Sequence, residues 1–140
     1  MKPQLLALLT AAAWGIGGYF EKKGLHLGNL PPQVGATLRT AVALLVLGIV
    51  AAPQLRTLTQ APPRALWSIA IGGGVVAGAI GILCFYAALK GAPLSRVMPI
   101  AFTSPLWGAA MGIAFAGEPL TLKTAAGGLL TVAGIVVLTI

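Results

Sequence analysis

Acidic residues are almost missing from this chain. Glu21 and Glu118 are the only two acids among 140 residues, and charged residues of both signs make up 8% of the sequence. A soluble domain carries roughly a quarter charged residues, which keep its surface in water. With 58% hydrophobic residues and a mean hydropathy of +0.97, the composition excludes an ordinary soluble protein and indicates an integral membrane protein.

Cysteine and histidine are equally scarce, with Cys84 and His26 as the single examples. A disulfide or a thiolate metal site needs paired cysteines, so Cys84 supports neither. His26 has no second histidine or cysteine near it in the sequence, and we expect no metal site. The sequence also lacks a nucleophile–base pair and a phosphate-binding loop. We therefore expect no enzymatic activity and no cofactor.

Basic residues give the chain a formal net charge of +7, which raises the question of nucleic acid binding. The lysines and arginines are dispersed, however, and most of them lie at the ends of apolar runs. Lysine and arginine in these positions are typical of membrane topology. We expect the lipid bilayer as a partner and no nucleic acid.

Long apolar runs dominate the sequence, and each is long enough to cross a hydrocarbon core of about 30 Å as a helix. Strands of a membrane barrel would instead alternate apolar and polar residues over about ten positions. The continuous runs predict an all-α membrane protein with five transmembrane helices. These are expected at about residues 3–20, 34–52, 66–89, 97–116 and 122–140, with polar loops at 21–33 and 53–64.

Glycines at a spacing of four recur within two of these runs. The pairs are Gly74 with Gly78 and Gly108 with Gly112. Such spacing leaves a strip of helix surface without side chains, where another helix can approach closely. We predict helix packing at both pairs.

Several residues in the last third predict where helices break and begin. Pro99 and Pro105 should kink the fourth run or make its start irregular. Thr121 has the side chain of a helix N-cap for the fifth run. We expect a structural role for Glu118, which either accepts hydrogen bonds from the first turn of that helix or pairs with Lys123.

Arg39 is the strongest single candidate for a functional residue. A helix that began after Arg39 would be too short to span, so Arg39 should lie inside the second helix. A charge there costs roughly 2.5–3.5 kcal/mol and usually faces a cavity or a partner. The alternative is that Arg39 extends from a shallow depth to the interface. Glu21, beside Lys22 and Lys23, is interpreted as an interfacial charge, and a position along the pathway is the alternative.

Aromatic and hydroxyl side chains provide the other candidates for a substrate pathway, because they give apolar walls with polar tips. Anchoring at the membrane interface is the alternative for the two tyrosines, and bonding to their own helix backbone is the alternative for the two hydroxyls. Together with Arg39, the candidates are Trp14, Tyr19, Tyr86, Thr103, Ser104 and Trp107.

A series of short motifs then points to a family. The motifs are Trp14-Gly15, Lys22-Lys23, Leu38-Arg39, Tyr86-Ala87-Ala88-Leu89-Lys90, Pro99, Ser104-Pro105, Gly117-Glu118-Pro119-Leu120-Thr121 and Gly127-Gly128. In this order and spacing the chain resembles the EamA-type domain of the drug/metabolite transporter superfamily. The resemblance covers essentially the whole chain as one domain, residues 1–140.

The resemblance implies a transporter in a bacterial or archaeal cytoplasmic membrane. Most members carry two five-helix domains in opposite orientations, so this chain resembles the short branch with one domain. It would form one half of a ten-helix inverted-repeat carrier, with a second copy or a paralogous five-helix half as partner. The relatives that couple transport to protons carry a glutamate in the middle of the first helix, whereas Glu21 follows the first apolar run.

Charge counting adds an argument about orientation. With five spans, each side of the membrane would carry four basic residues, apart from Arg39, and the positive-inside rule finds little bias. The two sets are Lys2, Arg56, Arg64 and Lys123 on one side, and Lys22, Lys23, Lys90 and Arg96 on the other. This balance predicts insertion in both orientations, although insertion in a single orientation remains the alternative.

Together these features predict a secondary transporter that moves a small polar or amphipathic metabolite by alternating access as an antiparallel homodimer. One alternative is an exporter of drugs or cations, although acids within the spans are nearly absent. The other is an accessory membrane subunit that does not transport.

Overall fold

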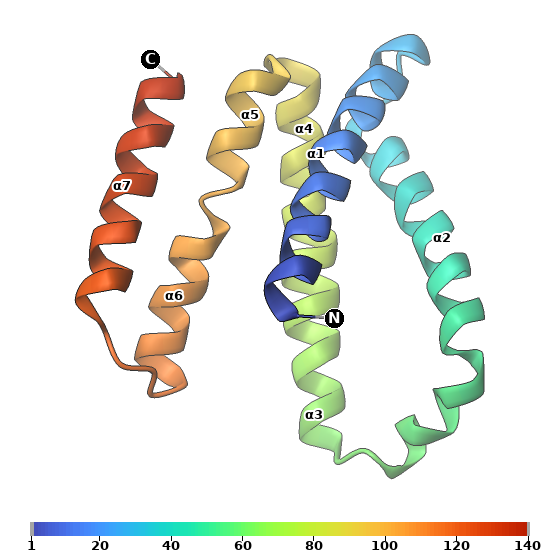
Figure 1. The fold of residues 1–140 in the computed structure, drawn as a ribbon. Helices are drawn as coiled ribbons and strands as arrows, with labels where there is room; N and C mark the ends of the chain where they lie inside the picture. The colour runs from blue at the N-terminus through green and yellow to red at the C-terminus, as the bar shows by residue number, and fades with distance from the viewer. Residues whose placement is uncertain (1, 140) are drawn as a thin grey trace. The chain divides into compact units, whose positions relative to one another are not determined.

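The computed structural model describes residues 2–139, and in this range every regular element is a helix. The elements are α1 (Pro3–Leu27), α2 (Pro32–Ala51), η1 (Ala52–Gln60), α3 (Pro63–Ser68), η2 (Ile69–Gly81), α4 (Ile82–Gly91), α5 (Leu94–Ala101), α6 (Ser104–Phe115) and α7 (Leu122–Thr139). The predicted all-α class is therefore confirmed for the described residues (Figure 1).

Four helical stretches within residues 2–139 are long and apolar enough to cross a membrane. They are Pro32–Gln60, Pro63–Gly91, Leu94–Phe115 and Leu122–Thr139. Helix α1 has 25 residues but is not among these four. The structure thus supports four spans directly, and the fifth span stays a prediction.

Helix α1 continues to Leu27, beyond the end of the first apolar run. It ends in a Schellman motif, in which the Leu30 N–H donates to the Leu25 carbonyl at 3.0 Å and the Asn29 N–H to the His26 carbonyl at 3.2 Å. Asn29 adopts the left-handed conformation that this motif requires, with φ of 44°. The predicted loop from residue 21 is therefore helical over its first half, and its charges lie on the helix.

The third apolar run contains a long π-helical segment, η2, between α3 and α4. In a π-helix each N–H donates to the carbonyl five residues earlier. That carbonyl can then lie close to the Cβ of the donating residue. A Cβ on Gly78 would lie 2.9 Å from the Gly73 carbonyl oxygen. Glycine at position 78 therefore avoids a close contact between a Cβ and this carbonyl. The predicted loop at 53–64 is likewise largely helical, since η1 occupies most of it.

The fourth run is broken as its prolines predict. Helix α5 contains Pro99 and ends at Ala101, and Phe102 leaves helical geometry with φ of −82° and ψ of 19°. Pro105 lies in the first turn of α6. Because Pro105 has no N–H to donate to the Ala101 carbonyl, the helix ends there and starts again.

The described chain divides into two compact units, each described here by itself. One unit comprises the chain up to Gly18 together with the residues from Ala92 onward. In this unit α5 packs against α7. A Cβ on Gly18 would lie 3.1 Å from the Met98 sulfur, so glycine lets α1 approach α5 closely. Among the described residues of this unit, Val97 is the buried hydrophobic one.

The other unit is Tyr19–Gly91, where α2 packs against α4. The two helices lie close at the α4 end and diverge toward η1 and α3 (Figure 1). Its buried side chains are Leu25, Ala36, Tyr86 and Leu89. The core of this unit is therefore formed where α1, α2 and α4 meet.

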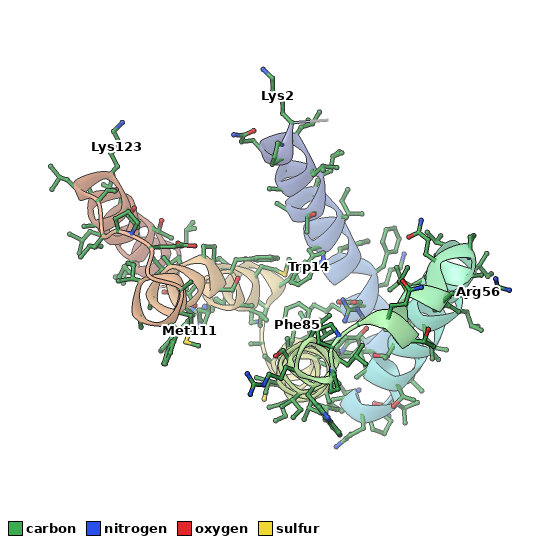
Figure 2. The ribbon with its side chains drawn as sticks, turned by 90° about the horizontal axis from the view of Figure 1, so that it is seen from below. Lys2, Trp14, Arg56, Phe85, Met111 and Lys123 are labelled. Carbon is green, nitrogen blue, oxygen red and sulfur yellow. The ribbon has the colours of Figure 1, made fainter. Side chains whose placement is uncertain are left out.

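Most large apolar side chains in both units are exposed. Figure 2 shows side chains that project outward from the helices, including Met111 on α6. Met111 is 58% exposed and Leu44 on α2 is 70% exposed. Apolar surface of this extent is stable only when lipid or other apolar surface covers it.

Candidate functional site

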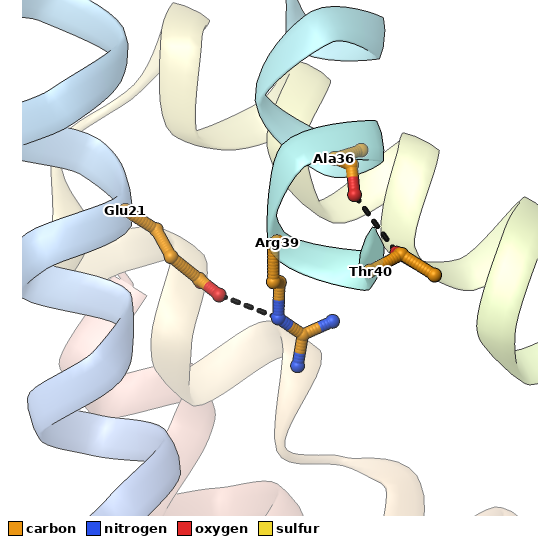
Figure 3. A network of polar contacts seen from close by, with 4 residues as sticks. All are labelled: Glu21, Ala36, Arg39 and Thr40. Carbon is orange, nitrogen blue, oxygen red and sulfur yellow. Dashed lines mark hydrogen bonds and ion pairs between the residues drawn. The ribbon is translucent and has the colours of Figure 1, made fainter. Parts of the chain in front are cut away.

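An ion pair between α1 and α2 is the central feature of the candidate site. The Arg39 Nε atom lies 2.7 Å from the Glu21 Oε1 atom (Figure 3). The Glu21 side chain is 17% exposed and the Arg39 side chain 36% exposed. The prediction that Arg39 lies inside a helix is confirmed, because α2 begins at Pro32. The extension of α1 beyond its apolar run places Glu21 opposite Arg39.

Tyr86 of α4 completes this cluster. Tyr86 is only 3% exposed, and it lies close enough to Glu21 and Arg39 to interact electrostatically with both. Gly35 makes room for its ring, since a Cβ there would lie 2.9 Å from Tyr86 Cε1 and 2.6 Å from Leu25 Cδ2. Helices α1, α2 and α4 therefore contribute one polar side chain each to a single cluster, Glu21–Arg39–Tyr86.

Two lysines connect α1 and α4 next to this cluster. The Lys22 Nζ donates to the Leu89 carbonyl at 2.7 Å. The Lys90 Nζ donates to the Leu30 carbonyl at 3.1 Å and to the Leu25 carbonyl at 3.4 Å. These carbonyls lie at or just beyond the C-terminal ends of α1 and α4, where cations are favoured by the helix dipole. The lysines therefore fix α4 against α1 around the Glu21–Arg39–Tyr86 cluster.

A groove of about 530 Å³ lies between α2 and the η2–α4 segment. It is lined by Ala36, Thr37, Thr40, Ala41, Leu44, Gly74, Gly78, Ala79, Ile82 and Leu83. The Thr40 hydroxyl donates to the Ala36 carbonyl at 2.8 Å (Figure 3), and the Thr37 hydroxyl donates in the same way to Gln33. The groove is thus lined by small and apolar side chains whose hydroxyl donors are satisfied within α2.

Tyr19 is in the same unit as Arg39 and Tyr86, but its surroundings differ. Its ring is 52% exposed and packs on Phe20 with 5.3 Å between ring centroids. The Lys23 Nζ lies 5.9 Å from the centroid of the Tyr19 ring. The structure therefore brings together Arg39 and Tyr86 of the predicted pathway residues, while Tyr19 lies outside their cluster.

The remaining predicted pathway residues belong to the other unit. Trp14 is 57% exposed, and its ring lies 6.0 Å from that of Phe102. The Thr103 hydroxyl donates to the Ile100 carbonyl at 2.9 Å. Ser104 starts α6, and Trp107 is 73% exposed. Their part in a pathway stays a prediction.

The glycines predicted to pack against another helix differ in their surroundings. A Cβ on Gly74 would meet the Ile69 carbonyl at 4.0 Å, and one on Gly108 would meet nothing within 4 Å. A Cβ on Gly112 would lie 2.6 Å from the Glu118 Oε2 atom. Gly74 and Gly78 also line the groove beside α2. Packing of a further helix on these glycines stays a prediction.

The start of α7 matches the predicted N-cap. The Thr124 N–H donates to the Thr121 hydroxyl oxygen at 3.1 Å, so Thr121 caps the helix as predicted. The Glu118 carboxylate lies over Gly112 of α6, and its backbone N–H donates to the Gly112 carbonyl at 3.1 Å. Within residues 2–139, no ion pair joins Glu118 to Lys123.

Glu21 is the residue of this cluster that sequence reasoning assigned to the interface. A signal for it does exist in the sequence. One of only two acids follows the first apolar run, and the arginine inside the second run follows after a short connection. Opposite charges at the joined ends of neighbouring apolar runs favour pairing, because each lowers the cost of placing the other near the membrane.

The fold and this cluster define the class of an all-helical integral membrane protein with a polar cluster between its helices. Over residues 1–140 the sequence matches the EamA-like transporter family, and the chain belongs to that family. No curated protein and no solved structure matches it. The chain is therefore a membrane transporter protein of the drug/metabolite superfamily.

Proposed function

We propose that the chain is a secondary transporter that moves a small polar or amphipathic metabolite by alternating access, as an antiparallel homodimer of five-helix halves. The observation that carries the proposal is the Glu21–Arg39 ion pair beside Tyr86. It places charged groups between helices of a chain whose exposed helix surface is largely apolar.

The energetic cost of these charges supports a functional role. Ionisable side chains in membrane segments are costly, and they usually mark substrate or ion pathways. Replacement of a buried ion pair by apolar residues is often neutral or stabilising, so stability alone does not require Glu21 and Arg39. A transporter does require polar groups near its substrate, and these two residues supply them.

The charge balance supports the antiparallel arrangement. Four basic residues on each side give the positive-inside rule little to distinguish, if α1 spans as the fifth helix. Two copies in opposite orientations would form an inverted repeat with a substrate site between the halves. The exposed apolar helices would then be covered by the second copy and by lipid.

Reconstitution in liposomes tests the function. We expect the purified chain alone to move at least one solute of a metabolite panel by counterflow. Arg39→Gln should abolish this flux, whereas Arg56→Lys, at an exposed position of η1, should preserve it because the basic residues on each side stay equal in number. Figure 2 shows Arg56 projecting away from its helix. If neither the wild type nor Arg39→Gln moves any solute of the panel, the proposal is wrong, and the alternative of an accessory subunit that does not transport replaces it.

A further inference from the structure

The guanidinium of Arg39 is only partly used by Glu21. The ion pair engages the Nε atom, and within residues 2–139 the two Nη groups make no hydrogen bond or ion pair. Figure 3 shows these two nitrogens turned away from the Glu21 carboxylate. A guanidinium carries five N–H donors, so most of the donors of Arg39 are available to a ligand.

These free donors are also accessible. The Arg39 side chain is 36% exposed, about twice the fraction of its partner Glu21 at 17%. Tyr86 is only 3% exposed, so Arg39 is the most exposed member of the cluster. A ligand that reaches the cluster would therefore meet hydrogen-bond donors first.

The charge around the cluster favours an anion. Lys22, Lys23, Arg39 and Lys90 lie in this unit close to Glu21, which is the only acid there. Lys90 donates to the Leu25 and Leu30 carbonyls, which are neutral acceptors, so these contacts leave its positive charge in place. The excess of positive charge attracts anions and repels cations.

We propose that Arg39 binds the carboxylate of the transported substrate through its Nη groups, while Glu21 holds the guanidinium in position. This inference rests on the proposed function and assigns its substrate class, an organic anion. The planar fork of a guanidinium matches the two oxygens of a carboxylate, and lysine offers no such fork. A phosphate group presents similar oxygens, and it could come from lipid headgroups as well as from solutes.

The test measures thermal unfolding of the purified chain in a nonionic detergent. The probes are acetate, hexanoate, phenylacetate and succinate, each compared with its amide at the same concentration and ionic strength. A ligand that binds the folded state raises the unfolding temperature in proportion to its occupancy. We expect at least one carboxylate to stabilise the wild type while its amide does not. If no carboxylate of the panel stabilises it, the proposal is overturned.

Three variants separate binding by Arg39 from a merely structural role. Arg39→Gln should lose the stabilisation by carboxylates, and Arg39→Lys should lose roughly tenfold in affinity because the fork is gone. Glu21→Gln keeps an acceptor for the Arg39 Nε but removes the competing negative charge. The Glu21→Gln variant should therefore bind the carboxylate roughly threefold to tenfold more tightly than the wild type does. A purely structural pair would give weaker binding in Glu21→Gln, which would contradict the proposal.

Two further arms identify the source of the anion and separate the two proposals. If phosphatidylglycerol added to phosphatidylcholine vesicles stabilises the wild type but not Arg39→Gln, and carboxylates do not, Arg39 is a lipid anchor and the proposal falls. Liposome flux is then measured independently. Flux of neutral solutes without carboxylate binding would overturn this inference and leave transport standing. Carboxylate binding without any flux would overturn the transport proposal instead.

Discussion

Lys22 and Lys90 each bind the C-terminal end of the helix that carries the other. Lys22 of α1 reaches the Leu89 carbonyl of α4 at 2.7 Å, and Lys90 of α4 reaches the Leu25 carbonyl of α1 at 3.4 Å. Lys90 also donates to the side-chain oxygen of Asn29 at 3.2 Å. The two helix ends are thereby joined, and Lys90 adds a second donor to the Leu25 carbonyl, which already accepts the Leu30 N–H.

Removal of one lysine should loosen this connection. Lys90→Met keeps the length of the side chain and removes its charge and donors. We expect a loss of about 1–3 kcal/mol in the free energy of unfolding, since acceptors bonded to a charged donor lose their partner. The measurement is thermal or denaturant unfolding in detergent. Lys123→Met, which removes an exposed lysine at the start of α7, should change stability little. Equal stability of both variants would contradict this interpretation.

Gly35 and Gly48 give a matched pair on α2. A Cβ on Gly35 would lie 2.6 Å from Leu25 Cδ2 and 2.9 Å from Tyr86 Cε1, whereas one on Gly48 would meet nothing within 4 Å. Gly35→Ala should therefore destabilise the protein by about 1–3 kcal/mol through overpacking. Gly48→Ala should be neutral or slightly stabilising, because alanine has the higher helix propensity. Unfolding curves of the two variants that coincide would show that α2 does not approach Tyr86 in this way.

The helices could be predicted from the sequence, but where they end and how they wind could not. The apolar runs locate α2, α7 and the broken α5–α6 segment, since run length and proline act locally. The end of α1 depends on Asn29 and on Lys90, which is distant in sequence. The glycine spacing predicts only packing of another helix, whereas in η2 a Cβ on Gly78 would also lie close to the Gly73 carbonyl oxygen.

Arg39 and Tyr86 could be predicted as candidate site residues from the sequence, but the ion pair of Arg39 with Glu21 beside Tyr86 could not. A charge inside an apolar run stands out in any membrane sequence, so Arg39 is found by composition. Glu21 lies at the border of its apolar run, where an interfacial position is the commoner outcome. Its pairing with Arg39 follows only when α1 continues past the run and the turn at Asn29 brings α2 back beside it.

The π winding can be tested at its closest contact. A Cβ on Gly78 would lie 2.9 Å from the Gly73 carbonyl oxygen, and backbone cannot move aside as a flexible side chain can. We expect Gly78→Ala to lower the unfolding temperature, or to rewind the segment as an α-helix. Gly72→Ala serves as control, because a Cβ there meets nothing within 4 Å. If Gly78→Ala is at least as stable as Gly72→Ala and leaves the helix winding unchanged, the steric account fails.

The last prediction concerns assembly and follows from the balance of basic residues. If α1 spans the membrane as the fifth helix, each side carries four basic residues apart from Arg39, and a few added or removed charges should decide the orientation. Leu58→Lys with Ala61→Lys should fix the N-terminus inside the cell, and Gly91→Lys with Lys2→Gln should fix it outside. An antiparallel dimer needs both orientations, so each variant alone should lose most of its transport, and coexpression of the two should restore it.

The measurements are solute uptake and labelling of a cysteine introduced at the N-terminus after Cys84→Ser. A variant confirmed in a single orientation that still transports at the wild-type rate would exclude the antiparallel dimer, and a parallel assembly or a different partner would have to supply the second half.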